Sequence, residues 1–173
     1  MNNEYIFTPT LDIDLEKIKE IALRRLSMPI EGMAVHQRNV SDEPYLVEVK
    51  EKYPFLGKIY NIYPTLADAV IPIHICPGRG CGLNFPIQYT TESHTIFYKF
   101  ITDNYTSLGH EDKVYDTFNP AHVEEVFRYT LEVPTLMNTR IPHSVISGPN
   151  EQRIILSWSI AVNFKIAKDL LGG

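Results

Sequence analysis

The chain has 173 residues, with 16 lysines and arginines against 21 aspartates and glutamates, which gives a formal net charge of −5 at neutral pH. This length favours a single domain spanning residues 1–173, and a hydrophobic share of 44% is ordinary for a chain that folds around its own core. An acidic balance provides no general attraction to nucleic acid or to an anionic membrane, so we expect neither as a partner.

The first element that the sequence predicts is a helix over about residues 15–26. Its apolar side chains recur at helical spacing, at Leu15, Ile18, Ala22 and Leu26. Asp12 or Asp14 can cap the start of this helix, because a short carboxylate accepts hydrogen bonds from the unpaired amides of the first turn. Pro29 marks its expected end. We expect the helix to pack on the outside of a sheet.

From about residue 45 onward the sequence changes to short apolar runs rich in Val, Ile, Thr, Phe and Tyr, separated by Pro, Gly, Asn and Asp. Runs of this kind, bounded by turn residues, are typical of an all-β sandwich or barrel. The predicted strands are residues 70–75, 81–89, 95–101, 126–132, 135–138 and 153–162. The polar residues 102–119 are predicted to form a long loop, and residues 164–171 a short closing helix.

Two of the six histidines, His74 and His143, lie at or beside predicted strands in apolar surroundings. The other four are interpreted as surface or structural residues: His36, His94, His110 and His122. Residues two apart on a strand face the same side, so we expect the side chains of His74 and Cys76 to point into the same space. Arg153 opens a very apolar strand, where a buried guanidinium needs an anionic partner. These features suggest an iron site beside a site for an acidic cosubstrate.

This arrangement resembles the iron(II)/2-oxoglutarate-dependent dioxygenases, the family that includes prolyl and asparaginyl hydroxylases. The family pattern is His-x-Asp, then a second His, then an Arg or Lys on the last core strand. This chain has His-Ile-Cys-Pro-Gly-Arg from His74, Pro-His-Ser-Val around His143, and Arg-Ile-Ile-Leu-Ser-Trp from Arg153. The resemblance covers about residues 70–162. It implies a mainly β fold, a double-stranded β-helix (jelly-roll, cupin-like) with its core at about residues 45–162 and a flanking N-terminal helix.

Roles for individual residues follow from the resemblance. His74 and His143 would bind iron(II), and Arg153 would bind the far carboxylate of 2-oxoglutarate. Asn84 and Tyr98 are candidates for further hydrogen bonds to the cosubstrate, or else for satisfying polar groups of the core. The implied activity is an oxygenase, a hydroxylase acting on a small-molecule or peptidyl substrate. The sequence identifies neither that substrate nor the oligomeric state.

Cys76 occupies the position where the family has the aspartate or glutamate that completes the metal ligands. Three interpretations stay open: the Cys76 thiolate is a ligand and the site suits other metals too, a water replaces it and two histidines suffice, or the metal site is degenerate. In the last case the chain would be a non-catalytic or repurposed jelly-roll binding protein. This alternative has to be weighed against the oxygenase interpretation.

The residues 76–81 form a predicted turn between two strands, with a cysteine at each end. The two cysteines would be close enough for a disulfide if they faced each other across a hairpin, although a reducing cytosol disfavours that bond. Arg79, inside the turn, is interpreted as a solvated side chain. The chain also lacks the glycine-rich, P-loop and Gly-x-Ser-x-Gly patterns of nucleotide-binding proteins and serine hydrolases.

Overall fold

The computed structural model of the chain describes residues 3–27, 38–57, 60–76, 78–103 and 116–172. Their strands form two sheets in which every pairing is antiparallel. The first sheet has the order β1 (Ile6–Phe7), β9 (Thr135–Met137), β5 (Cys81–Gln88), β11 (Arg153–Ile160), β3 (Tyr60–Thr65) and β2 (Arg38–Asn39). The second has the order β7 (Asp116–Thr117), β4 (Val70–Ile75), β10 (His143–Ile146), β6 (His94–Phe100) and β8 (Val123–Tyr129).

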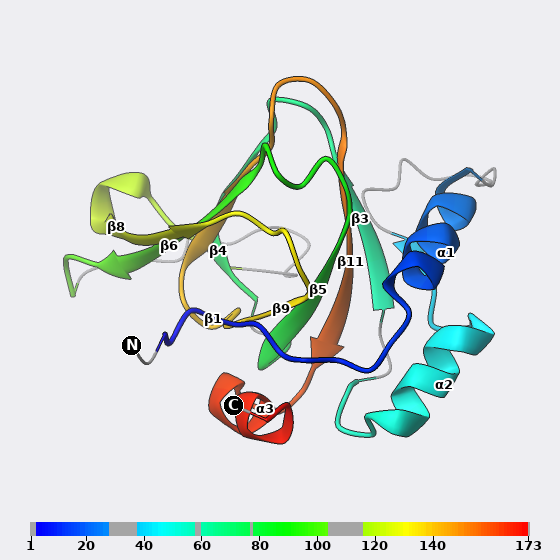
Figure 1. The fold of residues 1–173 in the computed structure, drawn as a ribbon. Coiled ribbons are helices and arrows are strands. Elements are labelled where there is room, and N and C mark those ends of the chain that lie inside the picture. Colours follow the sequence, from blue (N-terminus) through cyan, green and yellow to red (C-terminus); the bar gives the residue numbers. More distant parts are fainter. Residues whose placement is uncertain (1–2, 28–37, 58–59, 77, 104–115, 173) are drawn as a thin grey trace.

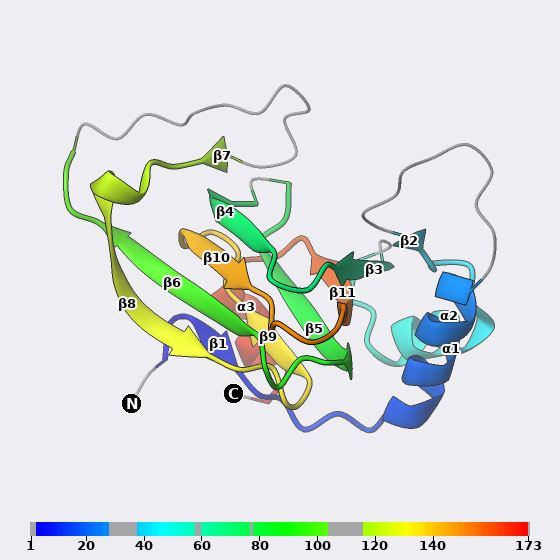
Figure 2. The same cartoon turned by 90° about the horizontal axis from the view of Figure 1, so that it is seen from above.

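The order in which the chain visits the two sheets defines the fold. From β3 onward it runs to β4 in the second sheet, back to β5 in the first, across to β6 and β8, then to β9, β10 and β11 in alternate sheets. Each sheet therefore pairs strands that are distant in sequence, and the two sheets face each other (Figures 1 and 2). This is the double Greek-key order of a jelly roll, so the fold class expected from the sequence is confirmed.

The helices also agree in part with the sequence analysis. The expected first helix is α1 (Leu15–Ser27), and the expected closing helix is α3 (Phe164–Leu170). A further helix, α2 (Pro44–Lys52), and the first core strand, β3, were not predicted. The core strands thus begin at Tyr60 rather than near residue 45. No helix in the described ranges has the length and apolar character needed to span a bilayer.

The remaining differences concern element boundaries. Strand β8 starts three residues before the predicted 126–132 and ends at Tyr129. The expected loop 102–119 contains the short strand β7 near its end, and the short 3₁₀ helix η1 (Pro120–His122) follows it. Residues 104–115 of this segment lie outside the described part.

The main hydrophobic core lies between the first sheet and the helices, not between the two sheets. On β11 the side chains of Ile154, Leu156 and Trp158 point out of the jelly roll and pack in one cluster with residues of all three helices. Helix α1 contributes Ile18 and α2 contributes Leu46 to the same cluster. Figure 1 shows α1 and α2 beside β3 and β11, on the side away from the second sheet. Burial of these apolar side chains supplies the largest favourable free energy of folding.

The opposite face of β11 carries a different kind of residue. Because side chains alternate along a strand, Arg153 and Ser157 point toward the second sheet, into the interior of the jelly roll. Asn84 on the adjacent β5 faces the same way, since its register partner on β11 is Ser157 and its neighbours Leu83 and Phe85 belong to the outer core. The first sheet therefore brings three buried polar side chains, Asn84, Arg153 and Ser157, into the interior.

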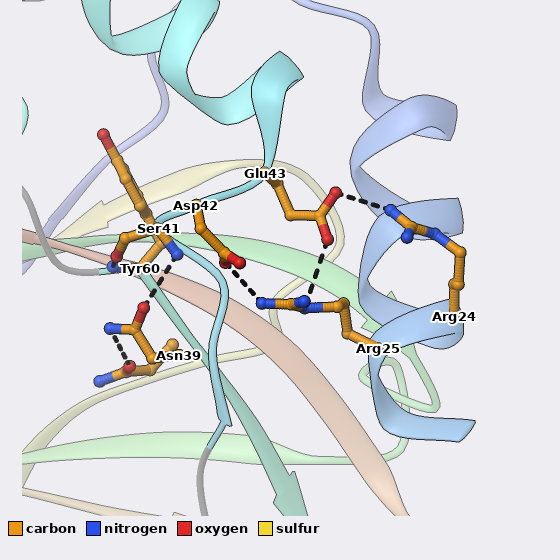
Figure 3. A network of polar contacts seen from close by, with 8 residues as sticks. Arg24, Arg25, Asn39, Ser41, Asp42, Glu43 and Tyr60 are labelled. Carbon is orange, nitrogen blue, oxygen red and sulfur yellow. Dashed lines mark hydrogen bonds and ion pairs between the residues drawn. The ribbon is translucent and has the colours of Figure 1, made fainter. Parts of the chain in front are cut away.

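A network of charged side chains fastens α1 to the start of α2 (Figure 3). Glu43 precedes α2, and its carboxylate contacts Arg24 Nη2 at 2.6 Å and Arg25 Nε at 3.2 Å. Arg25 also reaches Asp42 at 2.5 Å through Nη2. The Glu43 side chain is only 7% exposed, so its negative charge depends on these two guanidinium groups for compensation.

We expect Glu43→Gln to lower the free energy of unfolding by about 1–3 kcal/mol, because it keeps the side-chain volume but removes the charge that two arginines contact. Urea denaturation measures the change. The exposed pair of Glu125 and Arg128 provides the control, since Glu125→Gln should alter the midpoint little. Equal midpoints for the two variants would show that the network does not stabilise the fold.

Candidate metal centre

Three potential metal ligands meet at one end of the second sheet. His74 lies near the end of β4 and His143 at the start of β10, and the two are register partners on adjacent strands. Cys76 follows β4 directly, and because it comes two residues after His74 its side chain lies on the same side as that of His74. The imidazole nitrogens and the Cys76 sulfur all lie within 4.8 Å of one another. Two ligand atoms about 2.0–2.3 Å from one zinc ion are at most roughly 4.6 Å apart, so a small inward movement of these side chains would bring all three atoms within reach of one ion.

Both histidines are held in the same tautomer by their own backbone. His74 Nδ1 donates to the carbonyl of Pro72 at 2.7 Å, and His143 Nδ1 donates to the carbonyl of Ile141 at 2.8 Å. A carbonyl can only accept, so Nδ1 carries the hydrogen in each ring and Nε2 keeps a lone pair. Burial also lowers the pKa of His143, which outweighs the opposing effect of Cys76 and keeps this ring neutral. Nε2 is therefore the nitrogen through which each ring could bind a metal ion.

The Cys76 sulfur lies among hydrogen-bond donors and positive charge. Burial by itself raises the pKa of the thiol, but the adjacent side chains of His143 and His74 and the charge of Arg79 outweigh it and lower the pKa to about 4. Cys76 is a free cysteine. Two imidazoles and one thiolate form a donor set that suits iron(II), zinc and copper.

The buried cation expected from the sequence, Arg153, lies deeper in the same interior. Its side chain forms no hydrogen bond or ion pair with any residue in the described ranges, and Nε is buried without a partner. Burial lowers the pKa of Arg153, while the neighbouring Tyr129 phenol acts in the opposite direction. An unpaired guanidinium in such a place carries a large desolvation cost unless an anion joins it.

Tyr129 connects this cation to the three ligands. The Phe97 ring lies near both, with its centroid 5.9 Å from that of His143 and 6.2 Å from that of Tyr129. Burial raises the pKa of the Tyr129 phenol, partly offset by Arg153 and by hydrogen bonds from Thr95 and Asn84. The ligand cluster and the guanidinium thus both lie in the interior of the jelly roll, with Phe97 and Tyr129 near them.

Asn84 contributes a second buried group without a partner. Its Nδ2 donates weakly to the sulfur of Met137 at 3.8 Å, and its Oδ1 accepts no hydrogen bond. The Tyr129 hydroxyl approaches the same sulfur at 3.7 Å. Buried polar atoms are normally satisfied, so unpartnered atoms on Asn84 and Arg153 in one interior indicate a place for a polar ligand.

Tyr98, the other candidate for a cosubstrate contact, does not join these residues. The side chain of its neighbour Phe97 points inward, so Tyr98 points outward, where it packs with Ile73 and Phe118. Its hydroxyl pairs with that of Ser144 at 3.0 Å. Tyr129 takes the interior position instead, and sequence reasoning missed it. The signal that could have identified it is strand alternation: Phe127 pairs with the inward-pointing Phe97 of β6, so Tyr129, two residues later on β8, points inward as well.

The turn residues differ from expectation in one respect. Arg79 is not a solvated side chain, because Nη1 donates to Ser157 Oγ at 3.0 Å and Nη2 approaches Cys76 Sγ at 3.7 Å. Cys81 lies on the outer face of the first sheet, where its thiol donates to the carbonyl of Val162 at 3.4 Å. Both cysteines are free, and Cys76 points into the interior of the jelly roll whereas Cys81 points out of it.

Two of the remaining histidines, His94 and His122, lie away from the ligand cluster. His94 pairs with the Thr130 hydroxyl at 3.1 Å, and His122 is the last residue of η1. His36 and His110 lie outside the described residues.

Comparisons with known proteins give only distant likenesses. No protein-family model matches the chain, and no curated protein matches it. Among solved structures, AviO1 from Streptomyces viridochromogenes Tue57 has a TM-score of 0.47 and 13% identity, with 92% of this chain and 91% of that chain covered. Vicilin from Corylus avellana (hazelnut) has a TM-score of 0.42 and 10% identity over 79% of this chain. This chain matches 32% of the vicilin chain.

We expect Arg153→Met to raise the free energy of unfolding of the ligand-free protein by about 1–4 kcal/mol, because an apolar side chain of similar length removes the desolvation cost of an unpaired charge. Chemical denaturation without added anions measures the change. Arg128→Met, which alters an exposed arginine, is the control. A destabilised Arg153→Met would mean that the guanidinium is already paired in the free protein.

Proposed function

We propose that this protein is an iron(II)- and 2-oxoglutarate-dependent oxygenase that hydroxylates a small-molecule or peptidyl substrate. The main support is the buried guanidinium of Arg153, which has no partner among the described residues and lies in the same interior as three convergent side chains that could bind a metal. Neither feature stabilises a fold, since both place polar groups out of water at a cost in free energy. Their coexistence is explained by a ligand that binds a metal at one end and carries an anion at the other, as a 2-oxo dicarboxylate does.

The residues would divide the work as follows. His74 and His143 would hold iron(II) through Nε2, and Cys76 would complete the set through its sulfur. Arg153 would bind the distal carboxylate in a bidentate pair, with the Tyr129 hydroxyl and the Asn84 amide as further hydrogen-bond partners. When bound, iron(II) supplies dioxygen activation and the oxidative decarboxylation of 2-oxoglutarate, to which hydroxylation of the substrate is coupled.

Several features of the chain would prepare the site before binding. The Nδ1 hydrogen bonds to Pro72 and Ile141 fix both imidazole rings, so the metal meets nitrogen lone pairs that need no reorientation. The Phe97 ring, which packs near both His143 and Tyr129, would give the bound cosubstrate an apolar wall. The cosubstrate would also return a counter-charge to Arg153, which recovers the free energy lost when that cation was buried.

The first test is anaerobic addition of iron(II) and 2-oxoglutarate, monitored by the metal-to-cosubstrate charge-transfer band. The wild-type protein should develop this band, and Arg153→Met should weaken 2-oxoglutarate binding by at least about 30-fold, because it removes the partner of a buried carboxylate. Pyruvate, which has the 2-oxo acid but no distal carboxylate, should bind both proteins equally.

Controls separate this proposal from its alternatives. Arg128→Met should behave as wild type, since Arg128 lies on the outer surface. Absence of the band with iron bound would favour the repurposed binding protein. Bound metal without succinate formation in air would indicate a different mononuclear metalloenzyme.

Cys76→Asp tests the unusual ligand position. We expect it to raise iron(II) affinity, because a carboxylate oxygen is a harder donor than a thiolate sulfur and suits iron(II) better, while the affinity for cadmium falls. Isothermal titration of the metal-free proteins with each ion measures both changes. No gain in iron affinity would favour the degenerate-site interpretation, since the two histidines would then fail to bind iron even with a carboxylate beside them.

A further inference from the structure

Arg79 makes contacts that neither the fold nor the binding of a cosubstrate explains. It lies in the turn between β4 and β5, yet its side chain folds back into the interior instead of entering solvent. Nη2 lies 3.7 Å from Cys76 Sγ, and Nη1 donates to Ser157 Oγ at 3.0 Å. The guanidinium is thus fixed between the candidate sulfur ligand on one side and strand β11 on the other.

The surrounding residues leave room for this guanidinium. Gly82, on β5, faces it, and a Cβ atom added to Gly82 would lie 3.2 Å from Arg79 Nη1 and 3.5 Å from Ser157 Oγ. A side chain at this position would therefore press on the guanidinium and on its anchor. The glycine and the serine together form a niche that holds the end of the Arg79 side chain in one place.

The backbone of the turn is equally well held. Cys76 N donates to the carbonyl of Thr139 at 3.0 Å, and the Thr139 hydroxyl donates to the carbonyl of Arg79 at 3.5 Å. Gly80 N donates to the carbonyl of Ile160 at 2.9 Å, and a Cβ added to Gly80 would lie 2.1 Å from the carbonyl oxygen of Val162. Thr139 precedes β10, which carries His143, so the turn is tied to the strand of another ligand. Cys76 and Arg79 are thereby placed relative to each other and to His143.

From this geometry we infer that Arg79 is a positioning residue for the metal centre, which holds the Cys76 sulfur toward the two imidazoles by hydrogen bonding and by charge. In a site made of two histidines and one thiolate, the thiolate is the only negatively charged ligand. A cationic hydrogen-bond donor beside its sulfur, such as Arg79, would fix the direction of the sulfur and modify its strength as a ligand. The inference rests on the proposed metal site, and it concerns the ligand that departs from the family pattern.

The test is an anaerobic titration of the metal-free protein with cobalt(II), read by the thiolate-to-cobalt charge-transfer band and by the affinity. Arg79→Met should bind cobalt about 10-fold to 100-fold more weakly, the usual effect of losing an outer-shell partner. Its band should move to longer wavelength, because the sulfur lone pairs lose the donor that stabilises them. Arg79→Lys should recover part of the affinity, since it restores the charge without the guanidinium fork.

Two further variants keep the test decisive. Ser157→Ala keeps Arg79 but removes the hydroxyl that holds its guanidinium, so it should shift the band in the same direction by a smaller amount. This variant still tests the inference if near-ultraviolet circular dichroism shows that Arg79→Met folds poorly. Arg128→Met, on the outer surface, should match the wild type.

Different failures have different meanings. Wild-type affinity and an unshifted band in both Arg79→Met and Ser157→Ala would overturn the inference. A wild-type cobalt spectrum without a thiolate band would also overturn it, while leaving a two-histidine metal site intact. Failure of the wild type to bind cobalt or iron would contradict the proposed function as well.

Discussion

The packing of one face of strand β11 against three helices is the interaction on which the rest of the molecule depends. Ile154, Leu156 and Trp158 bury their side chains on that face, and each fully buried large apolar side chain contributes about 1.5–3 kcal/mol. Because this hydrophobic core lies outside the jelly roll, the space between the sheets need not stabilise the fold. The same strand can therefore carry Arg153 and Ser157 on its other face, where they are free to serve binding.

The sequence was most informative where function depends on local spacing. His74 and Cys76 are two residues apart on a strand, so their common direction follows from the alternation of side chains, and the structure brings both together with His143. Tyr98 shows the limit of such reasoning, because a shift of one residue along a strand moves a side chain to the opposite face. Its assignment to the interior was made without fixing the parity of β6 from the inward-facing Phe97.

Other features depended on contacts between distant parts of the chain. Helix α2 is short, and Leu46 and Val49 are its only buried residues, so its apolar pattern is weak. Its start is stabilised by the arginines of α1, which the local sequence cannot show. Likewise, Arg79 looked like a surface residue in a turn, because the niche that holds it comes from Gly82 and Ser157 on neighbouring strands. Local sequence thus predicted the jelly roll and the convergence of His74, Cys76 and His143, but not the contacts that support them.

The position of Trp158 has a practical consequence. It is the single tryptophan of the chain, it is fully buried, and its indole nitrogen donates to the carbonyl of Gly57 at 2.9 Å. It lies directly after Ser157 on β11 but faces the helices, with the Tyr60 ring against it at 3.7 Å between centroids. Its fluorescence consequently reports whether that strand and its outer packing are intact. A metal ion or cosubstrate bound in the interior would lie on the other face of β11, out of contact with the indole ring. The molecule carries its own optical probe of folding, separate from any signal of a bound metal.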